Sequence, residues 1–196
     1  MAQEIIPRWE WRTFAESFGA TENPFTAYEA GDTEDSDEIY FLSPATSENV
    51  KVRAGLLDIK MLQHRNADGL EQWKPVMKHE FPLPAELVNN VFDILGVSPP
   101  QLSRAQYTLE QLVQESIEPV AGMRVVNVHK TRTRYTVDGC MSELAEVVAD
   151  GKRTRTIAME LEDPGRVIAT VRKLGLDSYE NISYPRGLKR LVGMES

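Results

Sequence analysis

Three basic side chains recur at every second position within the stretch 124–162, and this spacing is the strongest constraint on the fold. They are Lys130, Arg132 and Arg134. Side chains of a strand alternate between its two faces, so the spacing places three positive charges in a row on one face. Asp-Gly pairs follow at 138–139 and 150–151, and this dipeptide is typical of tight hairpin turns. The stretch therefore predicts three successive antiparallel strands.

The last of these strands has two faces of opposite character. Ile157, Met159 and Leu161 fall on one face, whereas Glu160 and Glu162 fall on the other. The apolar face requires a core, and the acidic face requires water, a cation or a cationic ligand. Strand pairing would bring the basic row close to these carboxylates, an arrangement that suits a polyanion held together with a divalent metal.

The same alternation of charged and apolar residues recurs in five earlier segments. They are residues 7–14, 38–43, 49–54, 57–61 and 71–81. An open sheet could leave these charges in solvent, whereas a closed eight-stranded barrel could turn them inward around one small ligand. The pattern alone leaves both arrangements open. Arg-rich rows of mixed sign on most strands of an otherwise acidic chain favour the barrel.

Three further segments have the spacing of helices. Residues 84–95 carry apolar side chains at helical intervals and are followed by Gly96, which favours a helix end. Ser103 is the expected cap of a second helix through residue 113, and Asp163 that of a third, which ends at Gly175. Residues 15–36 are expected to form a solvated loop. The predicted fold class is α+β, with an eight-stranded antiparallel barrel and flanking helices.

Composition narrows the class of protein. The 196 residues are expected to form a single domain, 1–196, and the 30 acidic and 22 basic side chains give a net charge of -8. This charge argues against nonspecific binding to nucleic acid or to an anionic membrane. The single cysteine, Cys140, cannot form an internal disulfide, and no stretch approaches the about 20 apolar residues of a membrane span. We therefore expect a soluble cytoplasmic protein, and the sequence leaves open whether it forms a homodimer.

Several short motifs share one order along the chain with those of a known family. Arg8, Glu10 and Arg12 stand where that family has Glu-x-Glu-x-Lys, so the middle carboxylate alone is kept. The other motif positions are Lys51, Arg53 and Lys60, then Lys78, then Lys130, Arg132 and Arg134, then Glu143 or Glu146, then Glu160 and Glu162, and finally Tyr184, Arg186 and Lys189. Of the two alternatives we prefer Glu143. With these motifs nearly the whole chain resembles the CYTH domain family, also called triphosphate tunnel metalloenzymes.

The resemblance implies an eight-stranded tunnel that binds a triphosphate or polyphosphate with basic side chains and Mg²⁺ or Mn²⁺ with carboxylates. The implied catalytic residues are Glu10, Arg12 and Lys60. The implied substrate-binding residues are Lys51, Arg53, Lys78, Lys130, Arg132, Arg134, Arg186 and Lys189. The implied metal ligands are Glu10, Glu143, Glu160 and Glu162.

These residue types suit phosphoanhydride chemistry. Arg offers a planar fork for two phosphate oxygens, Lys acts as a point charge, and Mg²⁺ takes one or two carboxylates along with water and phosphate oxygens. Hydrolysis then depends on positioning and electrostatics, so it requires no Ser, Cys or His nucleophile. The sequence thus predicts a metal-dependent triphosphatase. The alternatives are a noncatalytic polyphosphate- or nucleotide-binding module, an adenylate-cyclase-type activity and an unrelated soluble β protein.

Overall fold

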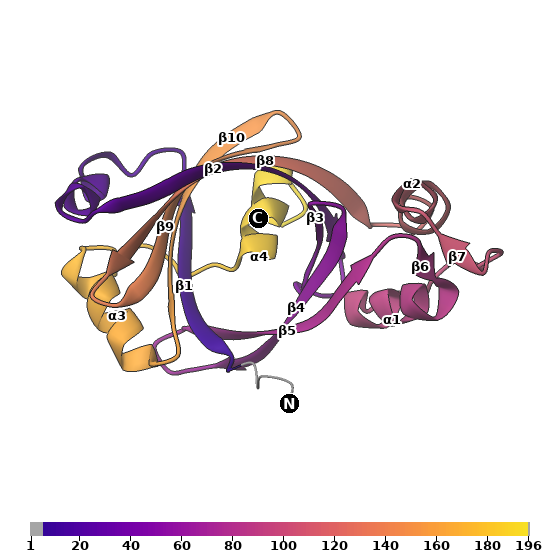
Figure 1. Ribbon diagram of the computed structural model, residues 1–196, viewed down its shortest axis with the longest axis horizontal. Coiled ribbons are helices and arrows are strands. Elements are labelled where there is room, and N and C mark those ends of the chain that lie inside the picture. The colour runs from indigo at the N-terminus through magenta and orange to yellow at the C-terminus, as the bar shows by residue number, and fades with distance from the viewer. Residues whose placement is uncertain (1–5, 196) are drawn as a thin grey trace.

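A closed barrel of eight antiparallel strands is the centre of the structure (Figure 1), a computed structural model that describes residues 6–195. Around the barrel the strands follow the order β1-β10-β9-β8-β2-β3-β4-β5. Their bounds are β1 Arg8–Ala15, β2 Ala30–Leu42, β3 Asn49–Arg53, β4 Leu56–Arg65, β5 Glu71–Glu80, β8 Arg124–Val137, β9 Cys140–Ala149 and β10 Lys152–Leu161. The predicted fold class is confirmed, and so is the inward arrangement of the charged faces that is described below.

The two predicted hairpin turns join β8 to β9 and β9 to β10. Asp138 and Gly139 have φ angles of 50° and 82°, and Asp150 and Gly151 have φ angles of 47° and 79°. Two successive residues with positive φ are characteristic of the type I′ turn, whose twist matches that of the flanking strands. The Asp-Gly pairs therefore fix the register that sends the basic row of β8 to the same face as the carboxylates of β9 and β10.

The predicted solvated loop at 15–36 is wrong over much of its length. Residues Gly19–Ala27 form the 3-10 helix η1, and β2 begins at Ala30. This early half of β2 has no apolar face, but it pairs with β8 so that Glu34 is opposite Arg132 and Asp37 is opposite His129. Cross-strand pairs of opposite charge stabilise a strand that hydrophobic periodicity does not reveal.

Helix α1 (Ala85–Leu95) follows its prediction and ends at Gly96, which has a φ of 67°. The second predicted helix is displaced. Gln106–Tyr107 is the short strand β7, which pairs with β6 (Leu83–Pro84), and the cap of α2 (Leu109–Gln111) is Thr108 rather than Ser103. The helix begins after Thr108 because this residue forms a capping box with Gln111, in which each side chain forms a hydrogen bond with the backbone of the other. The π-helix η2 (Leu112–Ile117) follows α2 directly. Together, α1, α2 and η2 cover the outer face of β3 and β4 (Figure 1).

Helix α3 (Pro164–Lys173) is capped by Asp163 as predicted, and it packs outside the barrel against the apolar faces of β1 and β10. Helix α4 (Tyr184–Val192) was not predicted. In Figure 1 it lies within the outline of the barrel. No helix in residues 6–195 is long and apolar enough to cross a membrane.

Helix α4 supplies an apolar floor to the barrel lumen. Its side chains Tyr184, Leu188 and Val192 pack against residues that include Val126 and Val128 of β8. These two valines belong to the same alternating row as the basic side chains, so the apolar start of the row lies under α4 and its charged part continues away from it.

A close contact beside Phe14 fixes the position of α4. A Cβ atom added at Gly187 would lie 2.5 Å from Phe14 Cδ2 and 2.8 Å from Phe14 Cζ. We expect Gly187→Ala to lower the free energy of unfolding by about 2 kcal/mol, because the overlap outweighs the better helix propensity of Ala. Urea denaturation measures this change. Gly165→Ala near the start of α3, where the added atom would meet only the Asp163 side chain, is the control and should differ from wild type by less than about 0.5 kcal/mol.

Candidate functional site

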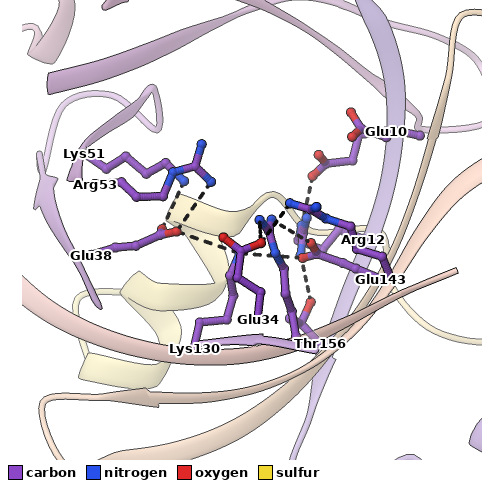
Figure 2. A network of polar contacts seen from close by, with 12 residues as sticks. Glu10, Arg12, Glu34, Glu38, Lys51, Arg53, Lys130, Glu143 and Thr156 are labelled. Carbon is purple, nitrogen blue, oxygen red and sulfur yellow. Dashed lines mark hydrogen bonds and ion pairs between the residues drawn. The ribbon is translucent and has the colours of Figure 1, made fainter. Parts of the chain in front are cut away.

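Charges of alternating sign cross the barrel lumen from β3 to β1 (Figure 2). At the β3 side, Lys51 Nζ donates a hydrogen bond to Glu38 Oε2 at 3.0 Å, and Arg53 Nη1 lies 3.9 Å from Glu38 Oε1. Lys130 Nζ lies between two carboxylates, 3.9 Å from Glu38 and 4.0 Å from Glu143. The lumen therefore contains a continuous network of ion pairs rather than a basic surface alone.

Arg12 is the centre of this network on the β1 side. Its guanidinium donates to Glu143 Oε1 at 2.8 Å, to Glu10 Oε1 at 2.9 Å and to Thr156 Oγ1 at 3.2 Å. The Arg12 backbone is bound as well, because Ile182 in the segment before α4 donates to its carbonyl oxygen at 2.8 Å. This cation is thus held in one orientation before any ligand arrives.

Towards the rim of the lumen the ion pairs become more exposed. Arg132 Nη2 lies 2.6 Å, and Arg134 Nη2 3.0 Å, from the same Glu34 oxygen. The Glu34 side chain is 45% exposed, whereas that of Glu38 is fully buried. The Arg134 side chain is 54% exposed, whereas that of Arg132 is buried. Exposed pairs contribute little and are readily exchanged, so Arg134 can change partners more easily than the inner lysines.

The network keeps its carboxylates ionised. Burial alone would raise the pKa of Glu38, but Lys51 and Lys130 outweigh it and lower that pKa to about 2. Burial likewise opposes ionisation of Glu143, yet Arg12 and Lys130 hold its pKa well below the usual range. At neutral pH the lumen therefore contains fixed charges of both signs.

Glu10 and Glu160 form a pair of a different kind. They are directly opposite each other on β1 and β10, and burial together with the Glu10 charge raises the pKa of Glu160. The nearest cation to Glu160 at ion-pair distance is Arg8, whose Nη1 is 3.6 Å from Oε1. Two carboxylates that face one space with incomplete neutralisation fit one divalent cation, the rest of whose ligands would be water and phosphate oxygens. Residues 6–195 contain no group of three or more acidic, His or Cys side chains arranged to hold a metal, so a larger set does not fit.

A cavity of about 570 Å³ opens beside these groups. Its charged lining consists of Glu10, Arg12, Glu29, Arg132, Arg134, Glu143 and Glu160. This volume is in the range of small-molecule sites, and the lining combines forked guanidinium donors with carboxylates. The arrangement can bind a compact polyanion that brings a cation with it.

The structure gathers most of the sequence-predicted site residues in the lumen. They are Glu10, Arg12, Lys51, Arg53, Lys130, Arg132, Arg134, Glu143 and Glu160. Glu143 faces Arg12, whereas the Glu146 side chain is 65% exposed beside Arg155, which supports the preference for Glu143. Lys60 is near enough to Glu160 to counter the rise of its pKa. The roles assigned to these residues remain predictions.

Four predicted residues lie apart from this group. Lys78 is an exposed residue of β5 that lies opposite Asp58 of β4, so it is on the lumen-facing side but outside the group named above. Glu162 is exposed just beyond the end of β10. Arg186 Nε contacts Glu195 at 3.3 Å, and Lys189 Nζ donates to the Thr46 carbonyl at 2.8 Å, so neither side chain reaches the lumen network. The binding and metal roles predicted for these four residues remain predictions.

Two lumen carboxylates, Glu34 and Glu38, were missed by sequence reasoning. Glu34 lies in the segment that was expected to be a loop. Glu38 begins a predicted strand, and its alternation with Tyr40 was the signal that could have placed it inside, since the Tyr40 hydroxyl donates to Glu38 at 2.8 Å. Both were overlooked because their partners come from β3 and β8, far away in sequence.

Comparison with solved structures shows the fold. A protein from Hippeastrum, described as a candidate adenylyl cyclase with a dominant triphosphatase activity, has a TM-score of 0.52 and 15% identity over 93% of this chain and 95% of that one. A candidate adenylate cyclase from Bacillus halodurans has a TM-score of 0.51 and 11% identity over 95% and 98% of the two chains. A protein from Pyrococcus horikoshii OT3 has a TM-score of 0.50 and 16% identity over 91% and 98%.

No family model matches the chain, and no curated protein matches it in sequence. At these low identities the similarity concerns the architecture. The tunnel barrel that the resemblance to the CYTH family implied is therefore confirmed as a fold, and the solved structures that share it include those described as cyclase and triphosphatase proteins.

The depressed pKa of Glu38 predicts a specific loss of stability in acid. The carboxyl titrates near 2 in the folded protein and near 4.3 in the unfolded chain. Its contribution is therefore complete above about pH 4.3 and is lost as the pH falls towards 2. Between pH 6 and pH 3, the free energy of unfolding should fall by about 2 kcal/mol more in wild type than in Glu38→Gln. Chemical denaturation at both pH values measures the difference, and equal losses in the two proteins would refute the assignment. The exposed Glu118→Gln is the control and should behave as wild type.

Proposed function

We propose that this protein hydrolyses the phosphoanhydride bond of inorganic tripolyphosphate or of an organic triphosphate inside the barrel lumen, with Mg²⁺ or Mn²⁺. The observation that carries the proposal is the meeting of Arg12, Arg132 and Arg134 with the Glu10–Glu160 pair around one cavity. The triphosphatase activity attributed to the Hippeastrum protein of the same fold supports it. The ligand is proposed to be a small triphosphate or polyphosphate and not a nucleic acid, because the net charge of -8 repels long polyanions.

The ligand would bind by exchange of ion-pair partners. Arg132 and Arg134 would release the half-exposed Glu34 and turn their forks towards phosphate oxygens, which are more highly charged acceptors. Arg12 need not move, because its guanidinium already lies at the cavity wall in a fixed orientation. A donor that is positioned before the reaction stabilises the developing charge without reorganisation.

Glu10 and Glu160 are the residues that would hold the divalent cation, since they face each other on paired strands and line the same cavity. Such an ion, when bound, supplies positive charge to phosphate oxygens and makes water more acidic. Arg12 would bind the phosphoryl group beside this cation, because it lines the same cavity and contacts Glu10 directly. Lys60 lies near Glu160 and would add positive charge at the same end of the cavity.

A noncatalytic phosphate-binding module is the second candidate, and one observation favours it. Arg8 stands where the similar family has a carboxylate, and its guanidinium is 3.6 Å from Glu160. A cation at this position competes with a metal ion for the same carboxylate. The fold is also shared with a protein described as a candidate adenylate cyclase, so formation of a cyclic nucleotide from ATP belongs in the same assay panel.

Removal of one carboxylate of the pair should abolish most of the activity. We expect Glu160→Gln and Glu10→Gln to lower kcat/KM for tripolyphosphate by at least about 100-fold, because each removes half of the proposed metal site. Phosphate release in the presence of Mg²⁺ or Mn²⁺ measures the effect. Glu118→Gln, an exposed carboxylate outside the barrel, is the control and should retain wild-type activity.

The alternatives give different results in the same assay. A wild-type protein that is stabilised by tripolyphosphate but releases no phosphate with either metal would be a binding module. A protein that shows neither turnover nor stabilisation would contradict both functions.

Arg8 provides a second test with the opposite sign. We expect Arg8→Gln to lower the Mn²⁺ concentration required for half-maximal activity by about fivefold, because it removes a competing charge beside Glu160. The Arg8 side chain is 45% exposed, so the substitution should change the folded structure little. An unchanged or increased metal requirement would show that Arg8 does not compete with the metal. Arg104→Gln removes an arginine from an exposed pair with Glu115 of η2, outside the barrel, and is the matched control.

A further inference from the structure

Glu38 is a fully enclosed carboxylate at the inner part of the lumen. Its side chain has no exposed surface and is surrounded by Lys51 and Arg53 from β3 and Lys130 from β8. The Tyr40 hydroxyl donates to Oε2, whereas Oε1 is buried without a hydrogen-bond partner in the described part of the chain. Figure 2 shows the Glu38 carboxylate pointing towards the side chains of Lys51 and Arg53.

This position is one that a phosphate group of a bound ligand could otherwise occupy. Three cations from two strands converge on it, and Glu38 is the one carboxylate within residues 6–195 that all three of them contact. Arg53 also lies 3.8 Å from Asp58, and Lys130 lies 4.0 Å from Glu143. An anion bound by Lys51 or Arg53 would lie close to the buried negative charge of Glu38, which both cations already contact. Repulsion between like charges is strong where water is excluded.

The effect of Glu38 extends to the cavity through Lys130. The Nζ atom of Lys130 is nearly equidistant from Glu38, at 3.9 Å, and from Glu143, at 4.0 Å. Glu143 in turn contacts Arg12 and Arg132, which line the cavity. The charge of Glu38 therefore determines how much of the Lys130 charge is left for a ligand.

We propose that Glu38 is a specificity-determining residue that occupies the inner cations in place of a ligand phosphate and thereby weakens anion binding. The ligand is then confined to the outer cations, Arg12, Arg132 and Arg134. This inference rests on the proposed function, because it concerns the phosphate chain that the same lumen binds. Its consequence is that the tunnel accommodates a short phosphate chain or a chain end, with Glu38 and the α4 floor as the inner limit.

The test is the affinity of Glu38→Gln for tripolyphosphate, measured by isothermal titration calorimetry in EDTA so that no hydrolysis occurs. Gln retains the shape of Glu and removes its charge, so we expect binding about tenfold tighter than that of wild type. A residue with a merely structural role would give the opposite result, because a loosened lumen binds more weakly. Unchanged or weaker binding by the folded variant overturns the proposal.

A second variant preserves the test if Glu38→Gln does not fold. Glu38→Asp keeps the charge but withdraws it from Lys51 by one methylene group, and it should bind tripolyphosphate about threefold tighter than wild type. No gain in this variant overturns the proposal as well. Glu118→Gln is again the control and should bind as wild type does.

Hydrolysis assays with Mn²⁺ on the same preparations separate this inference from the proposed function. If wild type hydrolyses tripolyphosphate but the Glu38 variants bind it no more tightly, the role proposed for Glu38 is refuted and the proposed function is not. Absence of both binding and hydrolysis in all the proteins refutes the inference and the proposed function together. If the Glu38 variants bind tripolyphosphate more tightly but no protein hydrolyses it, the role proposed for Glu38 is supported in a lumen that binds phosphate chains without cleaving them.

Discussion

The neutralisation of buried charge inside a closed barrel is the constraint on which the rest of this structure depends. A charge withdrawn from water costs several kcal/mol unless a well-placed partner compensates it. Here Glu38 and Glu143 each lie among cations from neighbouring or facing strands, and Lys130 is shared between the two carboxylates. No single strand could present such a face alone. The strand order that closes the barrel is therefore also the order that pairs the charges, and the register set by the Asp-Gly turns is required for both.

The same neutralisation shapes what the lumen can do. Its cations already have partners, so the proposed phosphate chain would have to replace carboxylates rather than fill an empty basic pocket. The exchange is easiest at the rim, where Glu34 is half-exposed, and hardest at the floor, where Glu38 is enclosed. Selectivity then follows from this gradient, since a ligand must supply enough charge to displace the outer partner.

The sequence predicts the parts of the fold whose signal is local. Period-2 alternation located the strands and put Lys130, Arg132 and Glu160 on their charged faces, although it left open whether these faces point inward. It missed the start of β2, because an exposed strand of acidic residues has no apolar face and depends on its pairing with β8. Helix α4 was not predicted because Pro185 and Gly187 have low helix propensity. Gly187 is nevertheless required in the folded protein, because a larger side chain would overlap Phe14. The sequence did not predict Glu34 and Glu38 as lumen carboxylates for a similar reason. Their cationic partners lie on other strands, so the ion pairs form only when those strands meet.

At the Glu10–Glu160 pair, Arg8 would have opposite effects on the stability of the fold and on the proposed binding of a metal ion. Glu10 and Glu160 face each other, and burial makes their mutual repulsion costly, as the raised pKa of Glu160 indicates. The guanidinium of Arg8 relieves part of this repulsion without any metal. A carboxylate at this position would add a ligand but also a third negative charge, which only a bound cation could balance. Arg8 thus brings the lumen closer to neutrality, and a metal ion bound at Glu160 would have to compete with this internal cation.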